Sequence, residues 1–230
     1  MSPKPPAPRA ALVYLHGFAS GPSSSKAQVL KQRFAALGVP MALPDLNEGE
    51  GGFERLTVTR MIAATRAAMA RARAESGLPA DGPVALLGSS LGGYTSALVA
   101  AREPSVVAAV LLAPAFCFPE RLEKRIRDED PGVLDRGFFE TFHYARNQNC
   151  RIATDIVTDG RQYEAWPEVR CPALIIHGKR DDVVPVDLSR EFSKSRQNVK
   201  LLELDDDHQL TSSVERIWTE ARAFLSPWLA

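Results

Sequence analysis

The chain has 230 residues, of which 28 are Lys or Arg and 28 are Asp or Glu, so its formal net charge is zero. A chain of this length can bury most of its surface in one α/β domain without metal or disulfide staples. The balanced charge provides no basic field for nucleic acid or an anionic membrane surface, and we expect neither partner.

The N-terminal segment 1–9 is rich in proline and lacks the apolar centre of a signal peptide, which predicts a short disordered lead-in. After it, short apolar runs alternate with amphipathic stretches. Because these runs are continuously apolar, they are typical of parallel strands that are buried on both faces. The runs cover residues 11–15, 39–43, 83–87, 106–112, 172–176 and 199–204.

Helices are expected between these strands. In the stretch 24–38, apolar residues recur at helical spacing and a glycine ends the pattern. Strands that alternate with helices predict a doubly wound, mostly parallel sheet in a single domain over 1–230. The other helices are expected over 54–75, after residue 90, over 187–196 and over 212–225.

The segment 117–170 departs from this alternation because it is charged, dotted with aromatic residues and weakly periodic. It could be an ordinary excursion that covers one edge of the sheet, or a small cap over a functional site. Long insertions in compact domains are often functional, so we favour the cap.

Residues 83–93 read PVALLGSSLGG, an apolar run that turns through small residues into a helical stretch. This is the layout of a nucleophile elbow, a cramped strand-to-helix turn in which the positions two before and two after the serine must be nearly free of side chain. Ser90 has Gly88 and Gly92 at those positions, whereas Ser89 would have leucines there. The pattern therefore predicts Ser90 as a nucleophile.

A serine hydroxyl needs a base within hydrogen-bond reach and a third group that orients the base. Of the four histidines, His208 comes last and follows a predicted strand, as the order Ser, Asp, His requires. The alternative is that it is a surface histidine in an acidic loop. The residues alone leave the acid open between Asp181, Asp182 and the run 205–207.

The chain contains the motifs LHGF at 15–18, GSSLGG at 88–93, HGKRDDVVP at 177–185 and DDDH at 205–208. Together these four motifs resemble the α/β-hydrolase superfamily across nearly the whole chain. More narrowly, LHGFASGPSSSKA and the short predicted cap are similar to small bacterial YqiA-like esterases, whereas a long lid of the lipase type has no counterpart here. The resemblance implies an α/β-hydrolase fold and a Ser-His-Asp triad.

The resemblance also implies roles for individual residues. HGKRDDVVP is similar to the segment H-G-x-x-D-x-x-V-P that carries the triad acid, and this alignment selects Asp181 over Asp182, with Asp206 as the fallback. The oxyanion hole would be formed by the backbone N–H groups of Leu91, which follows the nucleophile, and of Phe18, which follows the first His-Gly pair.

The walls of the substrate pocket are less constrained by the sequence. Aromatic residues near the motifs are candidates, with core packing as the alternative role for each. The candidates are Phe18, Phe116, Phe118 and Phe139.

The expected activity is that of a serine esterase that acts on small-molecule esters. The chain carries no G-x-G-x-x-G after a strand, no G-x-x-x-x-G-K-[ST] and no His or Cys pair at ligand spacing, so we expect neither cofactor nor metal. Its three widely spaced cysteines are typical of reduced thiols in a cytoplasmic protein. A thioesterase, a peptidase for short substrates and a non-catalytic binding protein are the alternatives, and the oligomeric state stays open.

Overall fold

The computed structural model describes residues 10–229, so the predicted lead-in at 1–9 lies outside the described range. Its centre is a six-stranded sheet in the order β2-β1-β3-β4-β7-β8, and every neighbouring pair is parallel. Each strand lies on one of the predicted apolar runs or extends it by a residue or two. The strands are β1 (Ala11–Leu15), β2 (Met41–Ala42), β3 (Val84–Ser89), β4 (Val106–Leu112), β7 (Ala173–Gly178) and β8 (Val199–Leu204).

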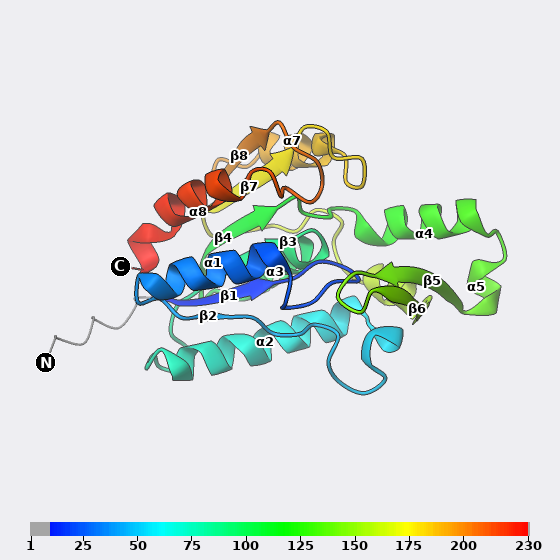
Figure 1. Cartoon of the computed structure of the whole chain (residues 1–230), viewed down its shortest axis with the longest axis horizontal. Coiled ribbons are helices and arrows are strands. Elements are labelled where there is room, and N and C mark those ends of the chain that lie inside the picture. Colours follow the sequence, from blue (N-terminus) through cyan, green and yellow to red (C-terminus); the bar gives the residue numbers. More distant parts are fainter. Residues whose placement is uncertain (1–9, 230) are drawn as a thin grey trace, which may run out of the picture.

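Helices cover both faces of the sheet, which is why most residues of the strands are apolar (Figure 1). Val13 of β1 belongs to the core on one face, whereas Leu12 and Tyr14 belong to the core on the other. Within residues 10–229, no helix is both long enough and apolar enough to cross a membrane. One face carries α1 (Ser25–Ala36) and α8 (Val214–Leu229), and the other carries α2 (Val58–Glu75), α3 (Leu91–Arg102) and α7 (Val186–Lys194).

The helix predicted over 54–75 begins later than expected. Residues Gly52–Arg55 form a separate 3-10 turn, η1, and α2 begins at Val58. The side chain of Thr57 accepts a hydrogen bond from the backbone N–H of Arg60 at 3.2 Å. This cap fixes the first turn of α2, because it satisfies one of the N–H groups that have no acceptor inside the helix.

The chain between β4 and β7 forms a small unit at the end of the sheet toward which β1 and β3 point, on the far side from the C-terminal end of α8 (Figure 1). Its antiparallel hairpin was not predicted, since its residues are mostly polar or half-exposed and give little apolar signal. The unit contains α4 (Phe118–Glu129), α5 (Val133–Arg136), β5 (Phe138–His143), β6 (Gln148–Ala153) and α6 (Asp155–Gly160).

The turn from β3 into α3 brings backbone segments unusually close together. A Cβ atom at Gly88 would lie 2.3 Å from the carbonyl oxygen of Gly92. A Cβ atom at Gly92 would lie 2.3 Å from the carbonyl oxygen of Leu15 and 2.4 Å from that of His16. Both positions therefore require glycine, as the sequence pattern around residue 90 indicated, and the end of β1 is held against the start of α3.

Gly92→Ala is expected to destabilise the protein, because its methyl group would force β1 and α3 apart. We expect a loss near the upper end of the about 1–3 kcal/mol that overpacking typically costs. Urea denaturation measures this loss. Gly132→Ala is the matched control, since its Cβ would meet only a side-chain oxygen of Asp130 at 3.6 Å. Equal stability of the two variants would contradict the prediction.

Candidate active site

Ser90 lies at the tip of the turn between β3 and α3. Its φ of 54° and ψ of −118° are strained values for a residue with a side chain. The backbone around it holds this conformation, because its N–H donates to the carbonyl of Leu112 at 2.8 Å and its carbonyl accepts from Ala115 at 3.0 Å. The hydroxyl is thereby presented above the ends of the strands, where it lines two cavities.

His208, on the loop between β8 and α8, joins Ser90 to Asp181. Its Nε2 lies 3.0 Å from Ser90 Oγ, and its Nδ1 lies 2.7 Å from Asp181 Oδ2. The carboxylate can only accept, so Nδ1 carries the proton and Nε2 is left to accept the proton of the serine hydroxyl. The structure thus brings together three side chains that are far apart in the sequence, in the geometry in which a histidine can act as a base.

Asp181 is held on the loop between β7 and α7 by an unusually full set of donors. Its Oδ1 accepts the N–H groups of Val183 at 3.0 Å and Val184 at 2.7 Å, while Oδ2 faces the histidines. Burial by itself would raise the pKa of Asp181, but hydrogen bonds from His177 and His208 outweigh it and hold that pKa well below its ordinary value. The carboxylate is therefore ionised at neutral pH, as an orienting acid must be.

His177 is a site residue to which the sequence analysis gave no role. It is fully buried, and its Nε2 lies 3.0 Å from Asp181 Oδ2 and 2.9 Å from the carbonyl oxygen of Val184. Its Nδ1 lies 2.7 Å from Ser189 Oγ, which donates to it when the Nε2 carries the proton. The sequence did contain a signal for this role: a His-Gly pair lies at the end of β7, four residues before Asp181. A side chain at the end of a strand can contact the turn that follows the strand.

Among the described residues, the other acidic candidates make no hydrogen bond to the His208 side chain. Asp182 is exposed, and Asp206 is buried with its Oδ1 on the N–H of Asp207 at 2.9 Å. Asp206 Oδ2 has no hydrogen-bond partner in the described part of the chain.

His143, the histidine of the insertion, is buried against Phe53 with ring centroids 4.7 Å apart.

Two backbone N–H groups near Ser90 are free to bind an oxyanion. Neither Leu91 N–H nor Phe18 N–H has a hydrogen-bond acceptor among residues 10–229. The loop that carries Phe18 packs on the nucleophile, since a Cβ at Gly17 would lie 3.3 Å from Ser90 Cβ. His16 fixes this loop: its Nδ1 donates to the carbonyl of Gly17 at 2.9 Å, and its Nε2 accepts the N–H of Leu46 at 2.9 Å.

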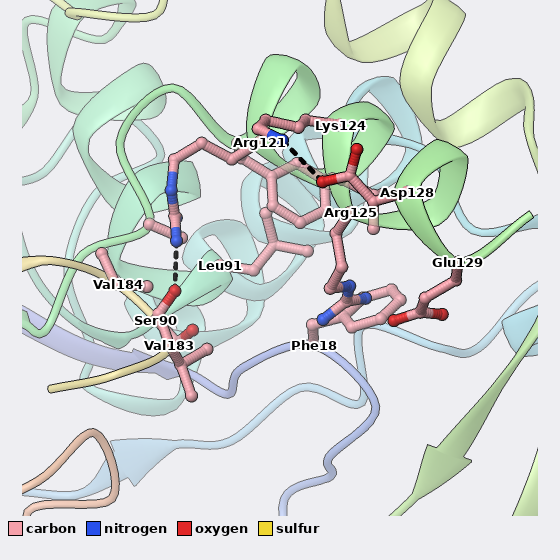
Figure 2. A pocket seen from close by; sticks show the side chains of 13 residues that line it. Phe18, Ser90, Leu91, Arg121, Lys124, Arg125, Asp128, Glu129, Val183 and Val184 are labelled. Atoms are coloured by element: carbon pink, nitrogen blue, oxygen red, sulfur yellow. Dashed lines mark hydrogen bonds and ion pairs between the residues drawn. The ribbon is translucent and has the colours of Figure 1, made fainter. Parts of the chain in front are cut away.

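Two cavities meet at Ser90, and Phe18, Arg125 and Val183 also line both of them. We call one the α4 cavity; it has a volume of about 420 Å³ and includes several residues of α4, as Figure 2 shows. We call the other the α1 cavity; it has a volume of about 340 Å³ and includes residues near the start of α1 together with His208.

The four aromatic residues predicted as pocket walls divide into two pairs. Phe18 lines both cavities and Phe118 lines the α4 cavity. Phe116 lines neither, because it is fully buried and stacks on Phe192 with ring centroids 4.1 Å apart. Phe139 lines neither and belongs to the hydrophobic core. The structure therefore gives these last two a packing role.

The site region contains no arrangement typical of a metal centre. Over residues 10–229, no group of three or more His, Cys, Asp or Glu side chains is placed to hold a metal ion. Cys117, Cys150 and Cys171 are free thiols, and burial raises the pKa of Cys171 to about 11.

Known proteins match the chain both in sequence family and in fold. A model of the family described as "Uncharacterised protein family (UPF0227)" matches residues 11–226. A search of curated proteins gives no match.

Among solved structures, the chain is similar to Est1E from Butyrivibrio proteoclasticus with bound ferulic acid, at a TM-score of 0.80 and 20% identity over 99% of this chain and 92% of that one. It is also similar to an Agrobacterium vitis S4 protein described as "Putative hydrolase", at a TM-score of 0.75 and 24% identity over 94% of this chain and 88% of that one. The similarity to mouse alpha/beta hydrolase domain-containing protein 10 has a TM-score of 0.72 and 18% identity over 99% of this chain and 92% of that one. The predicted α/β-hydrolase fold is confirmed.

Asp181→Asn is expected to change how stability depends on acid pH. Because the pKa of Asp181 is lower in the folded protein than the ~3.9 of an unfolded chain, the unfolded state takes up a proton first as the pH falls. The stabilisation is complete above that unfolded value and is lost as the pH falls toward the folded one. Below about pH 4, the wild-type unfolding free energy should decrease by up to about 1.4 kcal/mol per pH unit more steeply than that of the variant.

Urea denaturation at several acid pH values measures both slopes. Asp182→Asn is the matched control, since this neighbouring carboxylate is exposed and makes no hydrogen bond through its side chain among the described residues. Its slope should follow that of the wild type. Parallel slopes for wild type and Asp181→Asn would contradict the role assigned to Asp181.

Proposed function

The chain belongs to the UPF0227 family, whose model covers nearly its whole length, and from this premise we propose that it is a serine carboxylesterase for small acyl esters. The observation that carries the proposal is the continuous hydrogen-bonded series from Ser90 Oγ through both ring nitrogens of His208 to Asp181. Est1E, which has the same fold, binds ferulic acid, a carboxylic acid, and this supports an acid as the product released here.

In the first half of the proposed reaction, His208 Nε2 takes the hydroxyl proton of Ser90 as Oγ forms a bond to the carbonyl carbon of the ester. The carbonyl oxygen gains the negative charge, and the N–H groups of Phe18 and Leu91 stabilise it. When the tetrahedral intermediate collapses, the bond to the alcohol oxygen breaks and His208 gives its proton to that oxygen. Ser90 is left acylated.

In the second half, a water molecule takes the place of the alcohol. His208 accepts one proton of the water as its oxygen attacks the acyl carbon, and the same proton returns to Ser90 Oγ when the acid leaves. Throughout both halves the ionised Asp181 keeps the imidazole in one tautomer and stabilises it when it is protonated.

The geometry favours the proposal over one of its alternatives, the non-catalytic binding protein. A non-catalytic binding protein has no need of the strained serine, the oriented imidazole and the two vacant N–H groups, so their coincidence at one point favours catalysis. A thioesterase or a peptidase would use the same triad. Neither is favoured over an esterase by a specific contact, and an oxygen-ester series compared with its thioester and amide counterparts decides among the three.

Ser90→Ala should abolish the activity while leaving the fold intact. Removal of the nucleophile lowers kcat by roughly 10⁴ or more in other triads. The measurement is turnover of 4-nitrophenyl esters from acetate upward, together with covalent labelling by a fluorophosphonate. Ser193→Ala is the control, because this half-buried serine on α7 lines neither cavity, and it should retain both turnover and labelling. Near-wild-type turnover by Ser90→Ala would refute the proposed nucleophile.

His177→Ala should lower kcat with little change in KM, because Asp181 loses a buried donor and orients His208 less well. We expect a decrease of roughly 10- to 100-fold, typical of misplaced catalytic groups. His177→Gln, which keeps a side-chain N–H donor, should recover part of the loss. A change confined to stability, with kcat per folded molecule unaltered in both variants, would show that His177 does not position the site.

A further inference from the structure

The proposed reaction assigns the two cavities to the two parts of an ester. Protonated His208 must reach the oxygen of the departing alcohol, so the alcohol has to lie on the histidine side of Ser90. His208 lines the α1 cavity and is absent from the walls of the α4 cavity. The leaving group therefore occupies the α1 cavity, and the acyl group occupies the α4 cavity. This assignment rests on the proposed function.

The α4 cavity is lined by apolar side chains and by charged side chains of both signs, and all of the charged ones, including Arg125, come from α4. Lys124 pairs with Asp128 at 2.5 Å, and Glu129 adds a second carboxylate to the wall. Arg121 donates to the carbonyl of Val183 (Figure 2). Such a wall has little preference for charge in an acyl group. The apolar lining residues are Phe18, Leu91, Ala115, Phe118, Leu122, Val183 and Val184.

The α1 cavity differs because its walls contain two cations and neither Asp nor Glu. It also presents a set of hydroxyl groups that make no hydrogen bond to other side chains or to the backbone within residues 10–229, and that are free to donate to a ligand. Lysine, arginine and hydroxyl donors are the groups that bind carboxylates and phosphates. The hydroxyl residues are Ser20, Ser24, Ser25, Thr141 and Thr211.

Lys26 is the buried cation of this cavity, at 8% exposure. Its Nζ donates to the carbonyl of Gln209 at 2.8 Å, which leaves it further hydrogens to donate. Burial lowers the pKa of Lys26 to about 8 and the nearby Asp206, Asp207 and Asp181 oppose the shift, so the ammonium is mostly charged at neutral pH. These three carboxylates line neither cavity.

Arg125 is the second cation, and it lines both cavities where they meet at Ser90. In Figure 2 its side chain extends from α4 toward Phe18. It forms no ion pair among the described residues, unlike Arg127 on the same helix, which binds Glu123 at 2.9 Å. The α1 cavity thus has cations and hydroxyl donors but no carboxylate, whereas the α4 cavity has charges of both signs. From this contrast between the cavities we propose that the substrate is an ester of an uncharged, apolar acid with an alcohol that carries a carboxylate or a phosphate.

The test compares matched esters that differ only in charge and in its position. For the leaving-group side, the pair is 3-(4-butyryloxyphenyl)propanoate and its methyl ester, in which two methylene carbons insulate the phenol from the charge. For the acyl side, the pair is 4-nitrophenyl hydrogen glutarate and 4-nitrophenyl methyl glutarate. A fifth ester, 2-(4-butyryloxyphenyl)ethyl phosphate, distinguishes a phosphate from a carboxylate. Each kcat/KM is divided by the rate constant of alkaline hydrolysis.

We expect the wild type to prefer the anionic leaving group by about tenfold at low salt, the size typical of one or two charge-assisted contacts at a partly exposed site. The preference should decrease as salt is added. The acyl pair should show no such preference. Arg125→Gln should reduce the preference and Arg125→Glu should abolish or reverse it, whereas the control Arg127→Gln should keep the wild-type ratio.

The possible failures are distinguishable. Turnover of the neutral esters without preference for the anionic leaving group, or a preference that survives Arg125→Glu unchanged, would overturn the inference and leave the esterase proposal standing. A preference of the same size in the acyl pair would overturn the assignment of the cavities. Absence of Ser90-dependent turnover of every ester would overturn the proposed function, and the inference with it.

Discussion

The site depends on one buried carboxylate and the donors that keep it ionised. Two backbone N–H groups, at Val183 and Val184, and two histidines surround Asp181. Without these donors, burial would favour the protonated acid, which could not orient His208 as a fixed acceptor. Because the donors come from the end of β7, the turn after it and the loop after β8, the same hydrogen bonds that hold the charge also hold these segments together.

A second constraint is the close contact of backbone around the nucleophile. Gly88 and Gly92 let β1, β3 and α3 approach within distances that any side chain would prevent. This packing places Ser90 beside the loop of Gly17 and Phe18, so that the nucleophile lies close to the residues that carry the two vacant N–H groups. With His208 on one side of the nucleophile, the two cavities become chemically unequal, and the direction in which an ester lies follows from the position of the imidazole.

Local sequence patterns predicted some elements of this structure and not others. The six strands were predictable because helices bury both of their faces, and the register of the elbow was predictable because only residue 90 has glycines on both sides. The hairpin of β5 and β6 was not, since its half-exposed side chains carry no clear period. Local sequence also did not distinguish pocket residues from core residues. Phe118 lines a cavity and Phe116 stacks in the core, although they are two residues apart.

The sequence by itself determined the sheet, the position of Ser90 and the rank of His208 as the last histidine, because these depend on residue type and spacing along a short stretch. Residue type and spacing left Asp181 and its neighbour Asp182 equal, the family resemblance favoured Asp181, and the tertiary structure shows which of the two contacts His208. The two have the same chemistry, but one turns inward to meet His177, His208 and two N–H groups, and the other stays exposed. Contacts between segments that lie far apart in the chain, including the charge difference between the two cavities, leave no signature in local spacing and form only when the whole chain has folded.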